Sequence, residues 1–454
     1  MRRFLIIPGT LAVAVILMPS TLAGGSGQDA VPKEAGVDPA ALQAIKEQME
    51  ALKADYEKRL KALEAQVEAL QLQMLRSSPE VPVAPTPAPA SQSILGALNP
   101  AMTVVGNFVA RGDSQKVYSG QGGRIDNKPS LRETELDLRA AIDPYADGIF
   151  IASISSDSPG SYSAGVEEAY AVIKKLPFQS QPPLGLKLKV GRFRPSFGTN
   201  NILHTHDLPQ TMRPLPVQEF LGEEGFIQNG VSASFFLPTP WDRRSSLDAT
   251  LQVLAGGDLA FSPEPGARTA YLGHINWFRS FRSSHNLGVG WSSYFHPAGN
   301  EIVEADFHGL DFTYRWNPLR RGQWRSFVAG AELMFARRAV PGTAATGISA
   351  RAAANTAIAP GKPFGFTMFG QWQFNRRIYA GARWDRTAVL YDPALKRSSL
   401  TPYISYYFSE FLRFRLNYEQ RWSNLVTEDG RKSVFAELNF VFGSHPPEPY
   451  WVNK

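Results

Sequence analysis

The residues best suited to chemistry gather in one stretch, from Pro195 to Glu224. A loop this long in a compact architecture is usually functional. Rings or ladders of charge select ions and polar solutes by sign and size, so we interpret this stretch as the constriction of a pore. The alternative is that its charges only solvate an external loop. With the arginine that precedes the stretch, the constriction residues are Arg194, His204, His206, Asp207, Arg213, Glu219, Glu223 and Glu224.

A second set of charged residues lies on segments that alternate polar and apolar side chains. The expected pore-wall residues are Lys187, Lys189, Arg383, Arg413, Arg415, Glu419 and Glu437. Basic residues slightly outnumber acidic ones on this predicted wall, which predicts a weak preference for anions. Opposed Arg and Glu side chains also create a transverse field that orients dipolar solutes.

His204 and His206 are two residues apart, and both imidazoles could converge on one metal ion in a turn. Two ligands are too few, however, and the next carboxylate, Asp207, is adjacent rather than suitably remote. We therefore predict no metal and no cofactor. The sequence contains neither a G-x-x-x-x-G-K loop nor an HExxH motif, so we predict no catalytic residue. An outer-membrane phospholipase or protease is a minor alternative.

The elements that must position these residues are short alternating strands, which begin near Met102. In the region 411–422, Leu412, Phe414, Leu416 and Tyr418 share one face, and arginines and other polar residues take the opposite one. Aromatic residues near strand ends fit the interfacial girdles of a membrane barrel better than the faces of a soluble β-sandwich. The predicted strands are 102–112, 130–142, 147–157, 164–176, 184–194, 225–237, 247–256, 268–279, 284–295, 303–316, 323–338, 364–374, 377–387, 398–408, 411–422 and 432–442.

The lengths of the connections support a closed antiparallel barrel of about 16 strands, spanning residues 100–442. Every second connection is a short turn, such as Asp143 to Ala146 or Asn375-Arg376. The connections expected on the outside include the long ones, near 113–129, 195–224 and 339–363. An even strand number leaves both ends of the chain on the periplasmic side.

The regions outside the predicted barrel have their own patterns. Residues 1–23 carry two arginines, an apolar stretch and small residues before Gly24, which is typical of a signal peptide. Apolar residues at 40–75 recur every three or four positions and predict a periplasmic coiled coil that self-associates. Residues 77–93 form a proline-rich linker, and 443–454 form a C-terminal tail to which we assign no role. Basic residues are spread out rather than clustered, so no nucleic acid partner is predicted, despite a net charge of +6.

Two neighbouring strands resemble those of the phosphate-selective porin O and P family. The segments are Glu167-Glu168-Ala169-Tyr170 and Val190-Gly191-Arg192-Phe193-Arg194, followed by Pro195-Ser196-Phe197-Gly198. The similarity covers about residues 130–240 and implies a 16-stranded trimeric barrel with a basic, constricted pore. The acidic Glu219, Glu223 and Glu224 depart from the family pattern and argue against a strongly anion-selective filter.

We therefore predict a porin in the outer membrane of a Gram-negative-type bacterium, with its stalk in the periplasm. It would form a passive aqueous channel for small hydrophilic solutes or ions, weakly anion-preferring, with the third loop folded inward. Its expected partners are the lipid bilayer and two further copies of itself in a homotrimer. The main alternative is a structural tether that links the outer membrane to the cell wall or to a periplasmic partner through the coiled coil. A TonB-dependent transporter or a sheath around a multihaem electron carrier are lesser alternatives.

Overall fold

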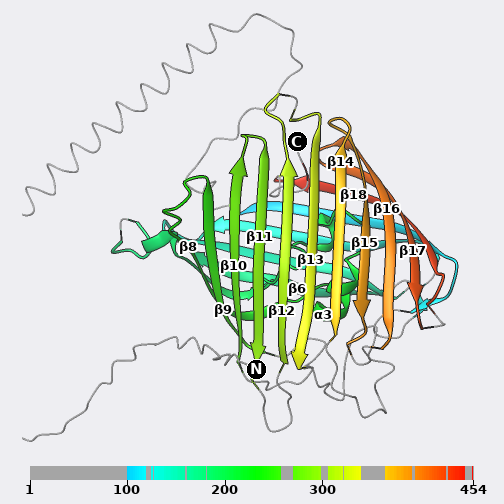
Figure 1. Ribbon diagram of the computed structural model, residues 1–454, viewed down its shortest axis with the longest axis horizontal. Helices are drawn as coiled ribbons and strands as arrows, with labels where there is room; N and C mark the ends of the chain where they lie inside the picture. The colour runs from blue at the N-terminus through cyan, green and yellow to red at the C-terminus, as the bar shows by residue number, and fades with distance from the viewer. Residues whose placement is uncertain are drawn as a thin grey trace, which may run out of the picture. The chain divides into compact units, whose positions relative to one another are not determined.

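The computed structural model describes residues 100–118, 124–125, 127–158, 161–179, 181–256, 269–297, 305–320, 322–338, 363–390, 394–425, 428–444 and 452. Sixteen of the described strands close into one antiparallel barrel (Figure 1), which confirms the predicted fold class. They are β1 (Ala101–Asp113), β4 (Pro129–Ala141), β5 (Ala146–Ser158), β6 (Ser161–Ile173), β7 (Lys187–Phe193), β8 (Gln228–Leu237), β9 (Ser245–Leu254), β10 (Ala270–Phe281), β11 (His285–His296), β12 (Ala305–Trp316), β13 (Ser326–Arg338), β14 (Phe364–Gln373), β15 (Ile378–Ala388), β16 (Lys396–Ser409), β17 (Leu412–Ser423) and β18 (Lys432–Gly443).

Each strand pairs with its neighbours along the barrel, and the first and last strands pair with each other. β1 lies antiparallel to β18, with Val105 opposite Val441, and also antiparallel to β4, with Val105 opposite Glu135. The remaining described elements are β2 (Val117–Tyr118) and β3 (Arg124–Ile125), which pair with each other, and the short helices η1 (Pro183–Gly185), η2 (Thr205–Asp207) and α3 (Leu215–Leu221). No helix in the described ranges is long and apolar enough to cross a membrane.

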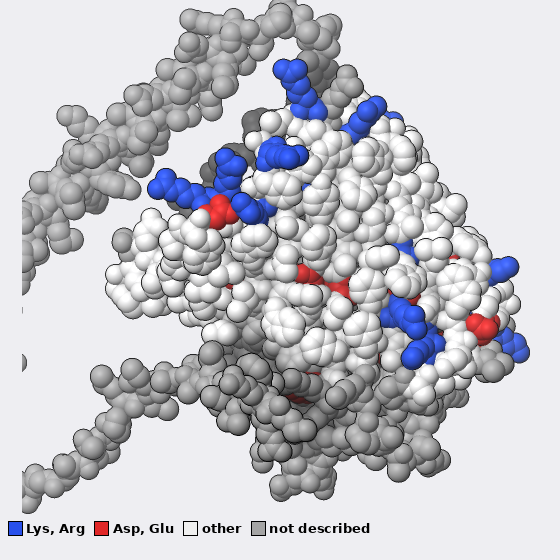
Figure 2. Space-filling view, viewed as in Figure 1, with Lys and Arg blue, Asp and Glu red and all other residues white. Residues whose placement is uncertain are grey.

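The alternation along each strand separates two surfaces, because successive side chains of a strand point to opposite faces. In β17, Arg415 and Asn417 are buried in the barrel interior, whereas Leu416 and Tyr418 are exposed on the outside. The outer surface in Figure 2 is largely uncharged, and Lys and Arg gather toward the strand ends. The outward aromatic residues include Trp372, Phe374, Trp384, Phe408 and Trp422.

Tyr407 corrects the predicted aromatic face. Aromatic residues near strand ends are predicted to face outward, as Phe408 does, but Tyr407 is 5% exposed and packs inside the barrel against Tyr379. Consecutive residues of a strand cannot share a face, and a register shift after Tyr407 marks the end of regular pairing with β17. Val452, from the predicted tail, belongs to the same buried cluster.

The short connections are built by their own polar side chains. Asp143 accepts hydrogen bonds from the backbone N–H groups of Tyr145 and Ala146, and Asn375 accepts them from Arg377 and Ile378. Asp and Asn favour turns because their side chains replace a missing backbone acceptor. The longest connection whose residues are all described runs from Arg194 to Ile227, between β7 and β8. The predicted signal peptide, coiled coil and linker lie outside the described residues.

Candidate functional site

The connection between β7 and β8 lies inside the barrel, and we call residues 195–224 the inward segment. All seven residues of α3, within this segment, are buried. Hydrogen bonds join the segment to the lumen faces of strands from β4 to β17. Pro214 and Pro216 suit the start of α3, where backbone N–H groups need no helical partner. Gly222, with φ of 97°, ends the helix.

One side of the inward segment packs on an apolar patch of the lumen. Phe197, Val217 and Phe220 are fully buried there, together with Leu272 of β10 and Phe307 of β12. These inward positions on β9 to β13 carry apolar side chains where a water-filled pore would carry polar ones. We call this contact the apolar anchor. The sequence analysis did not predict this contact.

The sharp turn at Gly198 is held by Glu332 of β13. The Glu332 carboxylate accepts hydrogen bonds from the backbone N–H groups of Thr199 and Asn200 and, at 2.6 Å, from the Thr199 hydroxyl. Gly198 has φ of 61°, and a Cβ atom there would lie 2.9 Å from the Glu332 carboxylate. Glycine at this position therefore satisfies both the left-handed backbone and the close approach of the strand.

The other side of the segment contacts arginines of β15, β16 and β17. Arg383 donates to the Met212 carbonyl at 2.6 Å, and Arg413 donates to the His206 carbonyl at 2.7 Å. Arg397 forms an ion pair with Glu219 at 2.7 Å. We define the basic sector as the inward-facing arginines of β15 to β17: Arg383, Arg397, Arg413, Arg415 and Arg421.

Carboxylates gather on the lumen faces of β4 and β6. We define the acidic sector as Glu133, Glu135 and Asp137 of β4 and Glu167 and Glu168 of β6. Glu167 and Glu168 are consecutive, yet both contact His204 of the inward segment, because Glu167 is the extra residue of a β-bulge opposite Ile151 and Ala152. β1 and β18 separate this sector from β17 in the barrel.

Arg194 and the two histidines fill the acidic sector. Arg194 pairs with Glu167 at 2.6 Å. His204 Nδ1 lies 3.2 Å from Glu135 and its Nε2 lies 2.9 Å from Glu168. Ionised carboxylates only accept hydrogen bonds, so both ring nitrogens donate and His204 is an imidazolium. His206 Nδ1 lies 3.1 Å from the same Glu135 carboxylate.

The pKa values of the histidines follow from these contacts. Burial lowers the pKa of His204, but the charge of Glu135 and the hydrogen bonds to Glu135 and Glu167 together hold the pKa well above 6.5. Burial also lowers the pKa of His206, and the carboxylates of Glu135 and Asp207 raise it to about 9. Both rings are therefore charged at neutral pH, and they bind the segment to the acidic sector as cations.

The structure brings together only part of the predicted constriction. Arg194, His204, His206 and Asp207 meet at the acidic sector, and Glu224 accepts from Thr205 nearby. Glu219 lies apart, at the Arg397 ion pair, and Glu223 is exposed.

Arg213, predicted as a constriction residue, is buried within the inward segment. It is 1% exposed and donates to the carbonyls of Asn200 and Leu203 within the segment's own backbone, so it braces the fold of the segment.

The predicted wall residues face inward, most with a partner. Glu437 pairs with Arg413 at 2.9 Å and with Arg415 at 3.2 Å, and Glu419 pairs with Arg421 at 2.9 Å. The Lys189 ammonium lies 4.3 Å from the centre of the Tyr170 ring. Lys187 is exposed at the start of β7.

Sequence reasoning missed the carboxylates that complete the site. Alternation placed Glu133 and Glu135 on the polar face of their strand, but nothing in the sequence showed that His204 and His206 would reach them. The two glutamates of β6 were quoted only as part of a family motif. Asp385, which accepts from Arg383 at 3.0 Å, was also missed.

Comparisons with known proteins agree with the fold. No family model matches the chain, so the resemblance to the phosphate-selective porin family stays a prediction. A protein of Aquifex aeolicus (strain VF5), described as uncharacterized, is 28% identical over 374 residues, which are 74% of each chain. Among solved structures, the chain is similar to OmpF of Salmonella typhi in complex with daunomycin, with 11% identity, a TM-score of 0.50, and coverage of 76% of this chain and 99% of that one. An anion-selective porin of Comamonas acidovorans matches at 8% identity and a TM-score of 0.49, with coverage of 76% and 99%. The barrel therefore has the fold of an outer-membrane porin.

Proposed function

We propose that this protein is an outer-membrane porin, a passive channel for small hydrophilic solutes or ions with a weak preference for anions. The inward segment is its constriction. The observation that carries the proposal is a barrel that is apolar outside, lined with charge inside, and crossed by the long connection between β7 and β8.

The outer surface supports insertion into a bilayer. A strand tilted in a membrane barrel needs about 9–11 residues to cross the hydrocarbon core. All the barrel strands except β7 have 10 to 14 residues. Outward residues such as Leu400, Ile404 and Leu416 are exposed although they are apolar, and lipid is the solvent that suits them.

The contacts of the inward segment support a constriction between two charged sectors. The His206 carbonyl accepts from Arg413 of the basic sector, while the His206 ring binds Glu135 of the acidic sector. One residue thus connects the two walls. Solutes that pass beside it would cross a transverse field, which favours polar and dipolar molecules over apolar ones.

The pairing of the arginines supports weak selectivity. Glu437 and Glu419 accept from the arginines of β17, and Asp385 accepts from Arg383. Paired charges of both signs leave the wall with a small net charge, so we expect anions to be preferred over cations only slightly. Such a wall favours general diffusion over a filter for one anion.

Planar-bilayer recording tests the proposal. The purified protein should give stepwise openings and a reversal potential shifted slightly toward the anion in a salt gradient. Arg421→Gln removes a basic lumen charge and should shift the reversal potential toward the cation. Arg320→Gln, an exposed arginine in the turn after β12, is the matched control and should change nothing. Absence of any open-channel step would contradict the proposal.

A homotrimer, an outer-membrane location and a periplasmic stalk belong to the same proposal. The exposed apolar outer face supports contacts with lipid and with further copies of the chain. Cross-linking in the membrane, read out as a ladder of three bands, tests the trimer.

A further inference from the structure

Glu133 is the carboxylate of the acidic sector that is left over. Glu167 pairs with Arg194, and Asp137 pairs with Arg139. Glu168 bonds to His204, and Glu135 is shared by both histidines. Glu133 is 5% exposed, and no described residue donates a hydrogen bond to its carboxylate or forms an ion pair with it. An ionised carboxylate buried without a partner is costly, so proteins pair it, protonate it or use it to bind a ligand.

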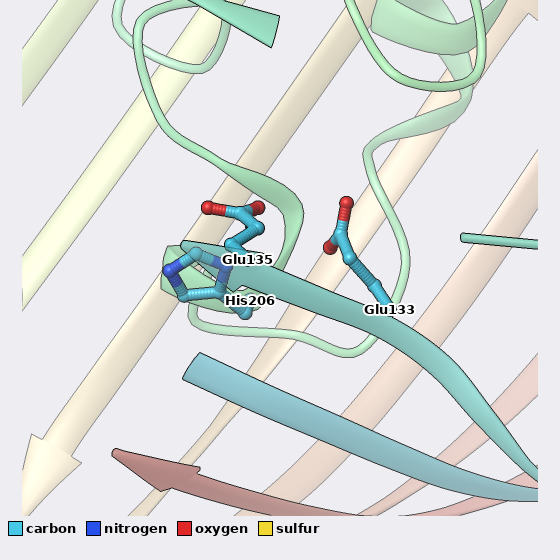
Figure 3. A group of neighbouring side chains, drawn as sticks. All are labelled: Glu133, Glu135 and His206. Carbon is cyan, nitrogen blue, oxygen red and sulfur yellow. Dashed lines mark hydrogen bonds and ion pairs between the residues drawn. The ribbon is translucent and has the colours of Figure 1, made fainter. Parts of the chain in front are cut away.

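The Glu133 carboxylate lies near other potential metal ligands. Figure 3 shows Glu133 and Glu135 extending from β4 on the same side, with the His206 ring beside Glu135. One ligand atom from each of these three residues lies within 4.8 Å of the other two. A second such group, Glu135, Glu167 and His204, shares Glu135 with the first. Small movements of long side chains bring such atoms to about 2.0–2.2 Å from a central ion.

We propose that Glu133, Glu135 and His206 bind one divalent transition-metal ion of the zinc type, which ties the inward segment to the β4 wall. One imidazole and two carboxylates are a mixed nitrogen and oxygen set. That set suits Zn²⁺ and similar ions, whereas Ca²⁺ and Mg²⁺ prefer oxygen alone and Cu⁺ prefers sulfur. The site is independent of conduction, because the ion is a fixed ligand and not the solute.

The ion would satisfy the charges that the protein leaves unbalanced. It would replace the proton that His206 shares with Glu135, and this proton would leave to solvent. It would also give Glu133 a cation in direct contact, since the described residues form no hydrogen bond or ion pair with its carboxylate and the His206 ring lies only nearby. The sequence prediction of no metal counted only Asp207 as a carboxylate. The carboxylates that approach His206 lie about 70 residues earlier in the chain, on β4.

Zinc titration of the full-length, untagged protein in detergent micelles tests the site. After treatment with a chelator, isothermal titration should show one saturable Zn²⁺ site per chain. Glu133→Gln should weaken the affinity at least tenfold and still fold, because Glu133 has no described partner to lose. His206→Asn should weaken it as strongly. His274→Asn is the matched control, since His274 lies on β10 and bonds to Ser292, and it should bind Zn²⁺ as the unmodified protein does.

Binding, infrared and X-ray absorption measurements can each overturn the proposal. One contradicting result is identical zinc binding by the unmodified protein and Glu133→Gln, or no saturable binding at all. Another is an infrared carbonyl band of a protonated carboxyl group that persists in saturating Zn²⁺ and disappears in Glu133→Gln, which would show that a proton already neutralises Glu133. X-ray absorption at the zinc edge gives an independent readout, with one imidazole and carboxylate oxygens expected. A spectrum without imidazole would also contradict the site.

Discussion

The two sides of the inward segment are held by different interactions, one side by apolar packing and the other by charged contacts. On β9 to β13 the segment buries aromatic and aliphatic side chains, including Phe197, Phe220 and Phe307. On β4, β6 and β15 to β17 it is held by ion pairs and charge-assisted hydrogen bonds, such as those of His204 and Arg397. Apolar burial contributes about 25 cal/mol per Å² whatever the pH, whereas a buried ion pair first has to offset the cost of desolvation. We therefore expect the apolar anchor to fix where the segment lies, and the charged contacts to respond to conditions.

Removing the Phe220 side chain is the most direct test of the apolar anchor. Its side chain is fully buried in the apolar anchor. Phe220→Ala should destabilise the docked segment by about 3–5 kcal/mol, the usual cost of removing a buried aromatic ring. The chain has no cysteine, so a spin label on Glu223→Cys reports the mobility of the segment by electron paramagnetic resonance.

The label should become more mobile in Phe220→Ala, and the single-channel current should become noisier. Phe178→Ala is the control, because Phe178 is 81% exposed in the turn before β7. An unchanged spectrum in Phe220→Ala would show that the charged contacts alone hold the segment.

High pH separates the two kinds of contact, because it weakens the charged contacts and leaves the apolar anchor unchanged. The pKa of His206 is about 9 in the folded protein, against 6.5 for the free side chain. The stabilisation from its protonated ring is therefore complete below pH 6.5, declines between 6.5 and 9, and is lost above 9. With a chelator present to exclude metal, the spin label on Glu223→Cys should gain mobility between pH 7 and 10.

His206→Asn is the matched variant, and its label mobility should not vary over the same pH range. The apolar anchor should keep the segment in the lumen at pH 10, so the change should be smaller than that caused by Phe220→Ala. A pH step of equal size in both proteins would assign the titration to another group. The charged groups that face the two imidazoles are Glu133 and Glu135 of β4, Glu167 and Glu168 of β6, Arg413 of β17, and Arg194 and Asp207 of the connection itself.

The same contrast explains what could be predicted from the sequence. The two-residue period of a strand is a local property, so alternation correctly placed Arg415 inside the barrel and Leu416 outside it. The structure also confirms the sixteen predicted strands, whose ends agree within about three residues. The site depends on contacts between residues far apart in the chain. The approach of His206 to Glu135 spans 71 positions. The bulge at Glu167 changes which residues of β6 face inward, and the alternation of polar and apolar residues does not predict it.

The smallest effect on the inward segment, on its apolar or its charged side, is expected from removing residues 40–75. We propose that residues 40–75 form a periplasmic coiled coil that self-associates. The apolar residues that recur every three or four positions predict that its helix packs against the same helix of another copy. Its deletion should leave single-channel conductance, reversal potential and the mobility of the Glu223→Cys label unchanged, while chemical cross-linking in the membrane yields fewer trimers. A matched variant replaces Leu60 and Leu63 by serine and keeps the length. If conduction were lost in both variants while the barrel still formed, the segment would have a role in opening the channel. If the oligomer persisted in both variants, contacts between barrels would be sufficient to hold the copies together. The coiled coil would then be better explained as a tether that links the outer membrane to the cell wall or to a periplasmic partner.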